Sequence, residues 1–352
     1  MTGSRMIVAS ALMALLAAVA SGCGSSSDRE TNTSLAAIDT PAPSTPPPPQ
    51  SSSSKPCADP TASLRPEGAL PIPGHMPAGT MMRRIQERGR LIAGVDQNTL
   101  GFAYLNPLTG QLQGFEIDLL RQLARVILGD PSKVEFEAIT TKQRLPYVQE
   151  GKVDVVADAV TITCDRLHDV AFSTVYYDAG QRVLVPSSSN VRRIEDLGGR
   201  YVRTSSGSWV YRQPRRVCAT STSTSLANIA KARPRPLPGA PSDRVAAPIP
   251  YPVAQRTDCL VALQEGKVDA ISTDDAILLG FAVQDPYTRN VGPRFTDEPY
   301  GIAINKAHPE FVRFVNGVLE RMRRDGTWKS IYTRWLAGIS TATSPPTPRY
   351  RD

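Results

Sequence analysis

Long apolar runs, histidines and metal-binding cysteine patterns are scarce in this sequence. No stretch of about 18 apolar residues occurs, so the sequence does not predict a membrane-spanning helix. Only three histidines are present and there is no Cys-x-x-Cys pair, so a zinc site is not expected. No Ser-His-Asp or Cys-His arrangement and no phosphate-binding loop supports a common enzymatic chemistry. We therefore expect no metal, no cofactor and no enzymatic activity.

The positive charge of the chain is confined to one segment. The whole sequence has a net charge of +7, whereas residues 192–244 alone hold eleven basic and three acidic residues. The remainder is close to neutral, which argues against a nucleic-acid partner, because nucleic-acid-binding folds line a surface with basic residues. With 41% hydrophobic and 21% charged residues, the chain can bury a core.

The amino-terminal residues have the pattern of an export signal. Arg5 precedes the apolar run 6–20, and Ala20-Ser21-Gly22-Cys23 follows. Small residues ending in cysteine resemble a bacterial lipobox, in which the cysteine is lipidated. We predict a signal peptide over 1–22 and lipidation at Cys23, with cleavage without a lipid as the alternative. A lipid anchor would hold the protein at the outer face of the cytoplasmic membrane, in the cell envelope.

Two terminal segments have the composition of unfolded chain. Residues 24–56 are rich in Ser, Thr and Pro and lack the apolar residues needed for a core. We predict a tether over 23–79, joining the lipid to the folded body. Residues 341–352, which include Pro345-Pro346, are predicted to form a loose tail.

Four cysteines remain once Cys23 is assigned to the lipid. Export places them in an oxidising compartment, where disulfides persist. Four cysteines allow three pairings. We favour Cys218–Cys259, because both lie in one segment, together with Cys57–Cys164; two or more free thiols are the alternative.

One phrase of six residues occurs twice. Gln-Glu-Gly-Lys-Val-Asp stands at 149–154 and again at 264–269. Each copy ends an amphipathic helical stretch, contains a glycine that stops the helix, and leads into an apolar strand. The repeat predicts the same helix–glycine–strand unit in each of two α/β lobes.

The residues after the two copies suggest a ligand. In open α/β sheets, ligands bind beyond the carboxyl ends of strands. Thr161 and Arg166 follow the first copy, and Asp274 follows the second. A guanidinium binds a carboxylate and an aspartate binds an ammonium, so the pair fits the two ends of an α-amino acid. Alternatively, Arg166 pairs with a surface acid such as Asp165, and Asp274 caps the next helix.

Several spaced motifs resemble one family. Gly114-Phe115-Glu116-Ile117-Asp118-Leu119 resembles its G-F-D-x-D-L signature, Thr161 to Arg166 resembles T-I-T-x-x-R, and Phe172 to Tyr177 resembles F-S-x-x-Y-Y. Asp325-Gly326-Thr327 with Trp335 resembles its terminal D-G-T…W. These motifs, spread over about residues 80–337, resemble the extracellular solute-binding proteins of the polar amino acid family, which feed ATP-driven (ABC) importers.

The resemblance implies a fold and partners. It implies an α/β, two-lobe periplasmic-binding-protein type II fold (Venus flytrap) with an inter-lobe cleft. Lobe 1 would comprise 80–178 and 299–340, and lobe 2 would comprise 179–298. The hinge would lie near 176–181 and 296–300. The expected partners are a polar amino acid (Gln, Asn, Glu or Asp), an ABC permease or a membrane sensor, and the membrane through the lipid; the protein is expected to be a monomer.

The same resemblance assigns roles to individual residues. Arg166 would bind the α-carboxylate with help from Thr161, and Asp274 and the Ala159 carbonyl would bind the ammonium. Asp96 would accept from a side-chain amide. The lobe 2 loop 217–225 would contribute Thr224, with 202–208 as the alternative loop. The implied ligand-binding set is Asp96, Ala159, Thr161, Arg166, Thr224 and Asp274.

The sequence also departs from the family pattern. Thr99 and Thr141 stand where relatives often place aromatic residues, which favours a smaller or more polar pocket. Residues 201–215 form an insertion and 232–252 a proline-rich loop, which are either solvated or a docking surface for an acidic partner or anionic lipid.

Two other functions are compatible with this fold. One is a sensor that presents its ligand state to a membrane receptor and moves no solute. The other is a dehydratase-like enzyme, which would need an acid or base such as Asp96, Glu116 or Asp158.

Overall fold

The computed structural model describes residues 57–352, apart from 204–208, 213, 221–227, 230, 233, 236–237, 239–244, 339 and 341–343. The predicted lipidation site Cys23, the predicted signal peptide and Thr224 lie outside these residues. Within the described part of the chain, no helix is long and apolar enough to cross a membrane.

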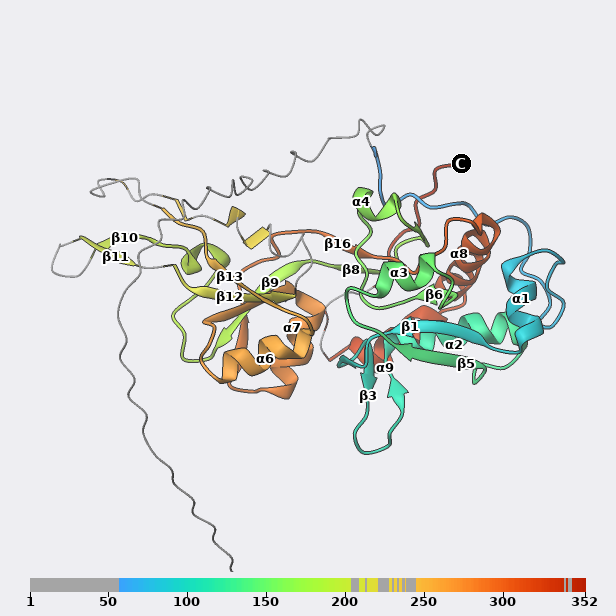
Figure 1. The fold of residues 1–352 in the computed structure, drawn as a ribbon, viewed down its shortest axis with the longest axis horizontal. Helices are drawn as coiled ribbons and strands as arrows, with labels where there is room; N and C mark the ends of the chain where they lie inside the picture. Colours follow the sequence, from blue (N-terminus) through green and yellow to red (C-terminus); the bar gives the residue numbers. More distant parts are fainter. Residues whose placement is uncertain are drawn as a thin grey trace, which may run out of the picture. The chain divides into compact units, whose positions relative to one another are not determined.

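Lobe 1 is built on a five-stranded sheet covered by helices (Figure 1). The strand order is β5-β1-β6-β17-β7, with β1 parallel to both β5 and β6. The strands are β1 (Leu91–Val95), β5 (Val134–Ala138), β6 (Val155–Val156), β7 (Ala171–Phe172) and β17 (Ala303–Ile304). The helices are α1 (Met81–Arg88), α2 (Phe115–Leu128), α3 (Arg144–Gln149), α4 (Cys164–Leu167), α8 (Pro309–Arg324) and α9 (Thr327–Leu336). A small sheet of β2 (Asn98–Thr99), β3 (Ala103–Leu105) and β4 (Leu112–Gln113) follows β1.

Lobe 2 repeats this plan with a second five-stranded sheet. Its strand order is β13-β12-β14-β9-β15, with β12 parallel to β13 and β14 and with β9 antiparallel to β14 and β15. The strands are β9 (Gln181–Pro186), β12 (Arg216–Thr220), β13 (Ile249–Val253), β14 (Ala270–Asp274) and β15 (Thr288–Val291). The other elements are the 3₁₀ helix η1 (Ile194–Leu197), the hairpin β10 (Arg200–Arg203) and β11 (Trp209–Arg212), and the helices α6 (Arg256–Gln264) and α7 (Asp275–Gln284).

The duplicated phrase forms the same unit in both lobes, as predicted. Gly151 and Gly266 both adopt left-handed backbone angles, with φ of 69° and 68°, which a glycine takes without a steric penalty. The aspartate that ends each copy accepts a hydrogen bond from the neighbouring strand. Asp154 Oδ2 lies 2.8 Å from the Ile92 nitrogen, and Asp269 Oδ2 lies 2.9 Å from the Arg216 nitrogen. Each copy therefore stops a helix and joins the next strand to the sheet.

Two antiparallel strands connect the lobes. They are β8 (Tyr177–Ala179) and β16 (Glu298–Tyr300), which run side by side in Figure 1. Aromatic rings pack on these strands: the Phe102 ring centroid lies 5.0 Å from that of Tyr177, and the Tyr177 centroid lies 5.7 Å from that of Tyr300. The pair falls within the two segments where the hinge was predicted.

The ends of the folded body differ from the predicted tether and tail. Residues 57–79 were assigned to the tether, yet Ser63 is buried and its hydroxyl donates to the Phe172 carbonyl at 2.7 Å. The predicted loose tail is paired with this segment, since Ser63 forms a parallel β-bridge with Tyr350. Arg313 forms an ion pair with Asp352 and fixes the last residue. Long-range contacts of this kind leave no composition signal, so the prediction missed them.

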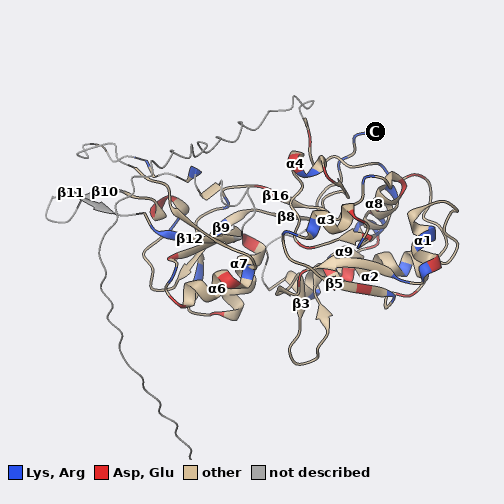
Figure 2. Ribbon diagram, in the orientation of Figure 1, with Lys and Arg blue, Asp and Glu red and all other residues tan. Residues whose placement is uncertain are grey.

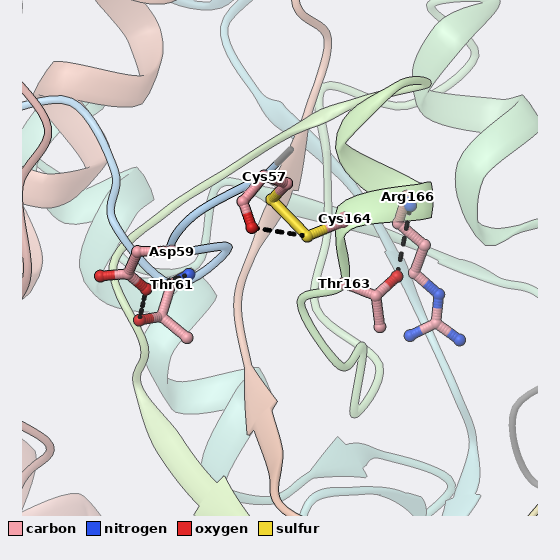
Figure 3. Close-up of a disulfide and its surroundings, with 6 residues drawn as sticks. All are labelled: Cys57, Asp59, Thr61, Thr163, Cys164 and Arg166. Atoms are coloured by element: carbon pink, nitrogen blue, oxygen red, sulfur yellow. Dashed lines mark hydrogen bonds between the residues drawn. A yellow bond between two sulfur atoms is a disulfide. The ribbon is translucent and has the colours of Figure 1, made fainter. Parts of the chain in front are cut away.

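Both favoured disulfides are present. Cys57 and Cys164 are bridged with their Cα atoms 5.7 Å apart, and Cys218 and Cys259 with theirs 5.5 Å apart. Figure 3 shows that the first bridge joins the amino-terminal segment to α4, the helix that also carries Arg166.

Positions of charged residues of both signs are spread over the helices of both lobes (Figure 2). Most of the insertion 201–215 and part of the loop 232–252 fall on residues that are drawn in grey there, and the side chains of β10 and β11 are not described. The role of the basic segment therefore stays a prediction.

Candidate ligand-binding site

Arg166 lies on a one-turn helix beyond the end of β6. The Thr163 hydroxyl caps α4 by accepting from the Arg166 backbone nitrogen at 3.2 Å (Figure 3). The guanidinium Nη1 donates to the Thr161 carbonyl at 2.6 Å. Arg166 forms no ion pair with any residue that the structure describes, so the predicted alternative of a pair with Asp165 is not observed. The half-buried guanidinium thus retains donors for an anion.

Asp274 is the last residue of β14 and is buried. Its carboxylate accepts a 2.5 Å hydrogen bond from the Tyr300 hydroxyl. It stands at the first capping position of α7, but its side chain makes no capping hydrogen bond, so it does not cap the helix in the way the alternative supposed. Among the described residues, no cation pairs with Asp274. Burial raises the pKa of this carboxyl to about 7, and the carboxylate of Glu298 adds to the shift.

Tyr300 lies between Arg166 and Asp274 in the chain of contacts. It forms a β-bridge with Thr161, whose carbonyl holds Arg166, and its hydroxyl holds Asp274. Burial lowers the pKa of Arg166, the nearby Arg144 adds to the shift, and the carboxylates of Glu298 and Asp274 oppose it. The guanidinium of Arg166 in lobe 1 and the carboxylate of Asp274 in lobe 2 therefore interact electrostatically.

The backbone between Asp158 and Thr161 is held in an unusual conformation. Ala159 has a positive φ of 47°, which is rare for a residue with a side chain. Its nitrogen donates to Glu116 Oε1 at 2.7 Å, and the same oxygen accepts from the Tyr176 hydroxyl. Burial raises the pKa of Glu116 to about 7, against these two hydrogen bonds. A buried carboxyl group at the start of α2 thus fixes the loop on which the Ala159 carbonyl lies.

Asp96 lies beyond β1 and is already fully engaged. Its Oδ1 accepts from the Gln97 nitrogen at 2.8 Å, and its Oδ2 accepts from the Thr99 hydroxyl at 2.5 Å and from Arg256 Nη1 at 2.7 Å. An amide of a ligand would have to share or displace these donors. The predicted contact between Asp96 and a ligand side chain stays a prediction.

Two buried arginines, Arg144 and Arg256, were not predicted from the sequence. Arg144 Nε lies 2.7 Å from Asp158 Oδ2, and Arg256 Nη1 lies 2.7 Å from Asp158 Oδ1. Burial raises the pKa of Asp158, and Arg144 opposes that shift. Both arginines are the first residues of helices, α3 and α6, where the helix dipole disfavours a cation. That unfavourable position was a signal that each needs a carboxylate partner.

The two threonines singled out earlier take part in this network. Thr99 donates to Asp96 and lies 3.2 Å from Arg256 Nη1, while the Thr141 hydroxyl accepts from Arg144 Nη2 at 3.4 Å. Polar residues at these positions therefore serve a buried ion network. Within the described residues, no group of His, Cys, Asp and Glu could hold a metal.

Comparison with known proteins identifies the family. The model of the bacterial extracellular solute-binding proteins, family 3, matches residues 91–338. The chain belongs to this family. It is 34% identical over 252 residues to the ABC transporter glutamine-binding protein GlnH of Bacillus subtilis, covering 72% of this chain and 83% of that protein. It is 37% identical over 231 residues to the glutamine-binding protein of Geobacillus stearothermophilus, covering 65% of this chain and 78% of that protein.

Solved structures of related proteins share the two-lobe fold. An ancestral arginine-binding protein bound to glutamine has 31% sequence identity and a TM-score of 0.58, over 71% of this chain and 98% of its own. An ancestral amino acid-binding protein, a precursor of cyclohexadienyl dehydratase, has 29% identity and a TM-score of 0.59, over 73% of this chain and 100% of its own. The predicted fold class, a periplasmic-binding-protein type II fold, is therefore confirmed.

Proposed function

We propose that this protein captures a polar amino acid (Gln, Asn, Glu or Asp) outside the cytoplasmic membrane for an ABC importer. The observation that carries the proposal is that Arg166 and Asp274 each lack a partner of opposite charge among the described residues. One is a half-buried guanidinium and the other a buried carboxylate; they come from different lobes, and neither forms an ion pair with a described residue. A buried charge without a partner is costly, and the two ends of a zwitterion would neutralise both.

Individual roles follow from this arrangement. Arg166 binds the α-carboxylate in bidentate fashion, with the Thr161 hydroxyl as a further donor. Asp274 and the Ala159 carbonyl bind the α-ammonium. Thr224 of the loop 217–225 is proposed to complete the carboxylate site from lobe 2. The lobes then close about β8 and β16, and the closed form is what a permease recognises.

The location and the form of the protein are part of the proposal. Cleavage after residue 22 and lipidation at Cys23 would place a monomer at the outer face of the cytoplasmic membrane. The similarity to proteins described as glutamine-binding and as parts of ABC transporters supports an importer as the partner. Uptake assays in a deletion strain separate transport from sensing: unchanged uptake of the bound amino acid would favour the sensor.

Isothermal titration of the purified protein with the four polar amino acids tests the proposal. We expect Arg166→Ala to weaken binding about 100-fold or more, because it leaves the α-carboxylate without its cation. Arg90→Ala is the matched control, since Arg90 pairs with Glu135 on the surface, where both side chains are about half exposed. Normal binding by a folded Arg166→Ala variant would refute the site.

An enzymatic function on the same fold is a second candidate, favoured by the similarity to a precursor of a dehydratase. Glu116, whose pKa burial raises to about 7, would be its acid or base. The similarity to proteins described as glutamine-binding favours capture of a ligand without chemical change. Recovery of the amino acid unchanged after long incubation would exclude catalysis.

A further inference from the structure

Arg256 brings a guanidinium of lobe 2 into a pair of carboxylates of lobe 1. Its Nη1 lies 2.7 Å from Asp96 Oδ2 and 2.7 Å from Asp158 Oδ1. Its Nη2 donates to the Asp158 carbonyl at 3.2 Å. The side chain of Arg256 is 7% exposed and those of the two aspartates are 7% and 1% exposed, so the contact is shielded from water.

The charges of this cluster balance only when Arg256 is counted. Asp158 has a second cation, Arg144, on its own lobe, with Nε 2.7 Å from Oδ2. Asp96 forms an ion pair with Arg256 and with no other described residue. Lobe 1 by itself therefore presents two carboxylates and one guanidinium, which is a site for one more cation.

This cation site adjoins the proposed amino acid site. Asp158 directly precedes Ala159, and Thr161 lies two residues further along the same loop. Arg256 touches the backbone of that loop through the Asp158 carbonyl. A ligand held by Arg166 and Asp274 that extends its side chain along this loop meets Asp158 and Asp96, and these are occupied by the guanidinium of the protein itself.

We propose that Arg256 determines the charge class of the ligand by filling the cation site of Asp96 and Asp158, so that amino acids with cationic side chains are excluded. The inference rests on the proposed function and extends it. An arginine or lysine ligand would have to expel Arg256, which would leave a buried guanidinium without a partner. A neutral amide or a carboxylate makes no such demand, because it can accept from the guanidinium that is in place.

The decisive variant is Arg256→Met, which keeps an unbranched, flexible side chain and removes the charged guanidinium. Isothermal titration compares L-glutamine, L-glutamate, L-arginine and L-lysine on the wild type and the variant. We expect the wild type to reject arginine by about 100-fold relative to glutamine, and Arg256→Met to raise the affinity for arginine relative to glutamine at least about tenfold. Lys267→Met is the control, since it removes one positive charge from an exposed pair with Glu265.

A second variant covers the case in which Arg256→Met fails to fold. Asp96→Asn removes one negative charge from the cluster, so the positive charge of Arg256 is no longer balanced. We therefore expect the affinity for glutamate to rise about fivefold relative to glutamine. The inference would be overturned by unchanged selectivity in a folded Arg256→Met variant or in Asp96→Asn. It would also be overturned if the wild type bound arginine as well as glutamine. In each of these cases the proposed function still stands. A wild type that binds none of the polar amino acids would instead refute the proposed function, and the inference with it.

Discussion

At the scale of single residues, the role proposed for Asp274 would couple ligand binding to pH. Burial raises the pKa of its carboxyl from the ordinary value of 3.8 to about 7. The ammonium of an amino acid favours the ionised carboxylate, so a protonated Asp274 must lose its proton before the ligand binds. The proton competes with the ligand below that pKa.

We therefore predict that affinity falls by up to about tenfold per pH unit as the pH drops below 7. Titration calorimetry between pH 5 and 8 measures the slope. Asp274→Asn should bind weakly and without this slope, because an amide does not titrate. An affinity that is flat from pH 5 to 8 in the wild type would contradict the role of Asp274.

Glu116 links folding stability to pH in a separate way. Its pKa is raised from 4.5 to about 7, so the folded state holds the proton more tightly than the unfolded state. The contribution of Glu116 to stability is then fully present below pH 4.5 and is lost as the pH rises to 7, by about 3 kcal/mol. Glu116→Gln should remove this loss, so the melting temperature of the variant should fall less between pH 5 and pH 8 than that of the wild type. The exposed Glu135→Gln is the control; an equal pH response in wild type and Glu116→Gln would count against the shift.

At the scale of elements, α4 depends on a disulfide for its position. It has only four residues, too few for a helix to be stable by itself. Cys164 binds it to Cys57, and Arg166 stands two residues beyond (Figure 3). The covalent bond therefore supports the residue that we assign to the ligand carboxylate.

Replacing Cys57 and Cys164 together by serine should lower stability and weaken amino acid binding. The bridge spans 107 residues of sequence, and a loop of that length corresponds to about 4–5 kcal/mol of chain entropy. Urea unfolding measures the first effect and calorimetry the second. Leu319→Ala is the control: this side chain is buried on α8, outside the proposed site, so stability should fall by about 2–5 kcal/mol while the bridge to α4 stays intact. Equal losses of affinity in the two variants would contradict a specific role for α4.

Much of the element layout could be predicted from the sequence. The duplicated phrase predicted the same helix–glycine–strand unit twice, because helix stops and apolar strands are local patterns. The ion network of Arg144 and Arg256 could not be placed in this way. Its members are joined by tertiary packing over separations such as the 160 residues between Asp96 and Arg256, which no local pattern encodes.

At the scale of the whole molecule, the two lobes are joined by the paired strands β8 and β16. Gly180 follows β8, its nitrogen lies 3.3 Å from Asp275 Oδ1, and its carbonyl accepts from the Asp275 nitrogen at 2.9 Å. A Cβ atom on Gly180 would overlap the Thr296 carbonyl. The two connections between the lobes are thus packed together without room for a side chain.

Gly180→Ala should force these connections apart. We expect a loss of about 1–3 kcal/mol in stability and a weaker ligand-induced rise in melting temperature. Thermal unfolding with and without glutamine measures both. Gly338→Ala is the control, because a Cβ there meets nothing within 4 Å. Wild-type behaviour of Gly180→Ala would show that the connections tolerate displacement.

The fold of the whole molecule was predictable and its ends were not. Spaced motifs identified a two-lobe clamp, since these motifs record how the lobes are built. Residues 57–65 and 346–352, however, are held by single contacts, such as the β-bridge between Ser63 and Tyr350 and the hydrogen bond that the Tyr350 hydroxyl donates to Glu320 on α8. The composition of the adjoining Ser-, Thr- and Pro-rich stretch suggested unfolded chain, whereas the bridge between Cys57 and Cys164 and the burial of Ser63 hold the first segment in place.

The disulfide between Cys57 and Cys164 also determines where a force on the amino-terminal chain would act. A pull on the chain ahead of residue 57 is carried by a covalent bond straight to α4, and so to the helix of Arg166, before it reaches the first strand of the sheet. Tension at the amino end and the contact that we propose between Arg166 and a ligand carboxylate would therefore act on the same short helix.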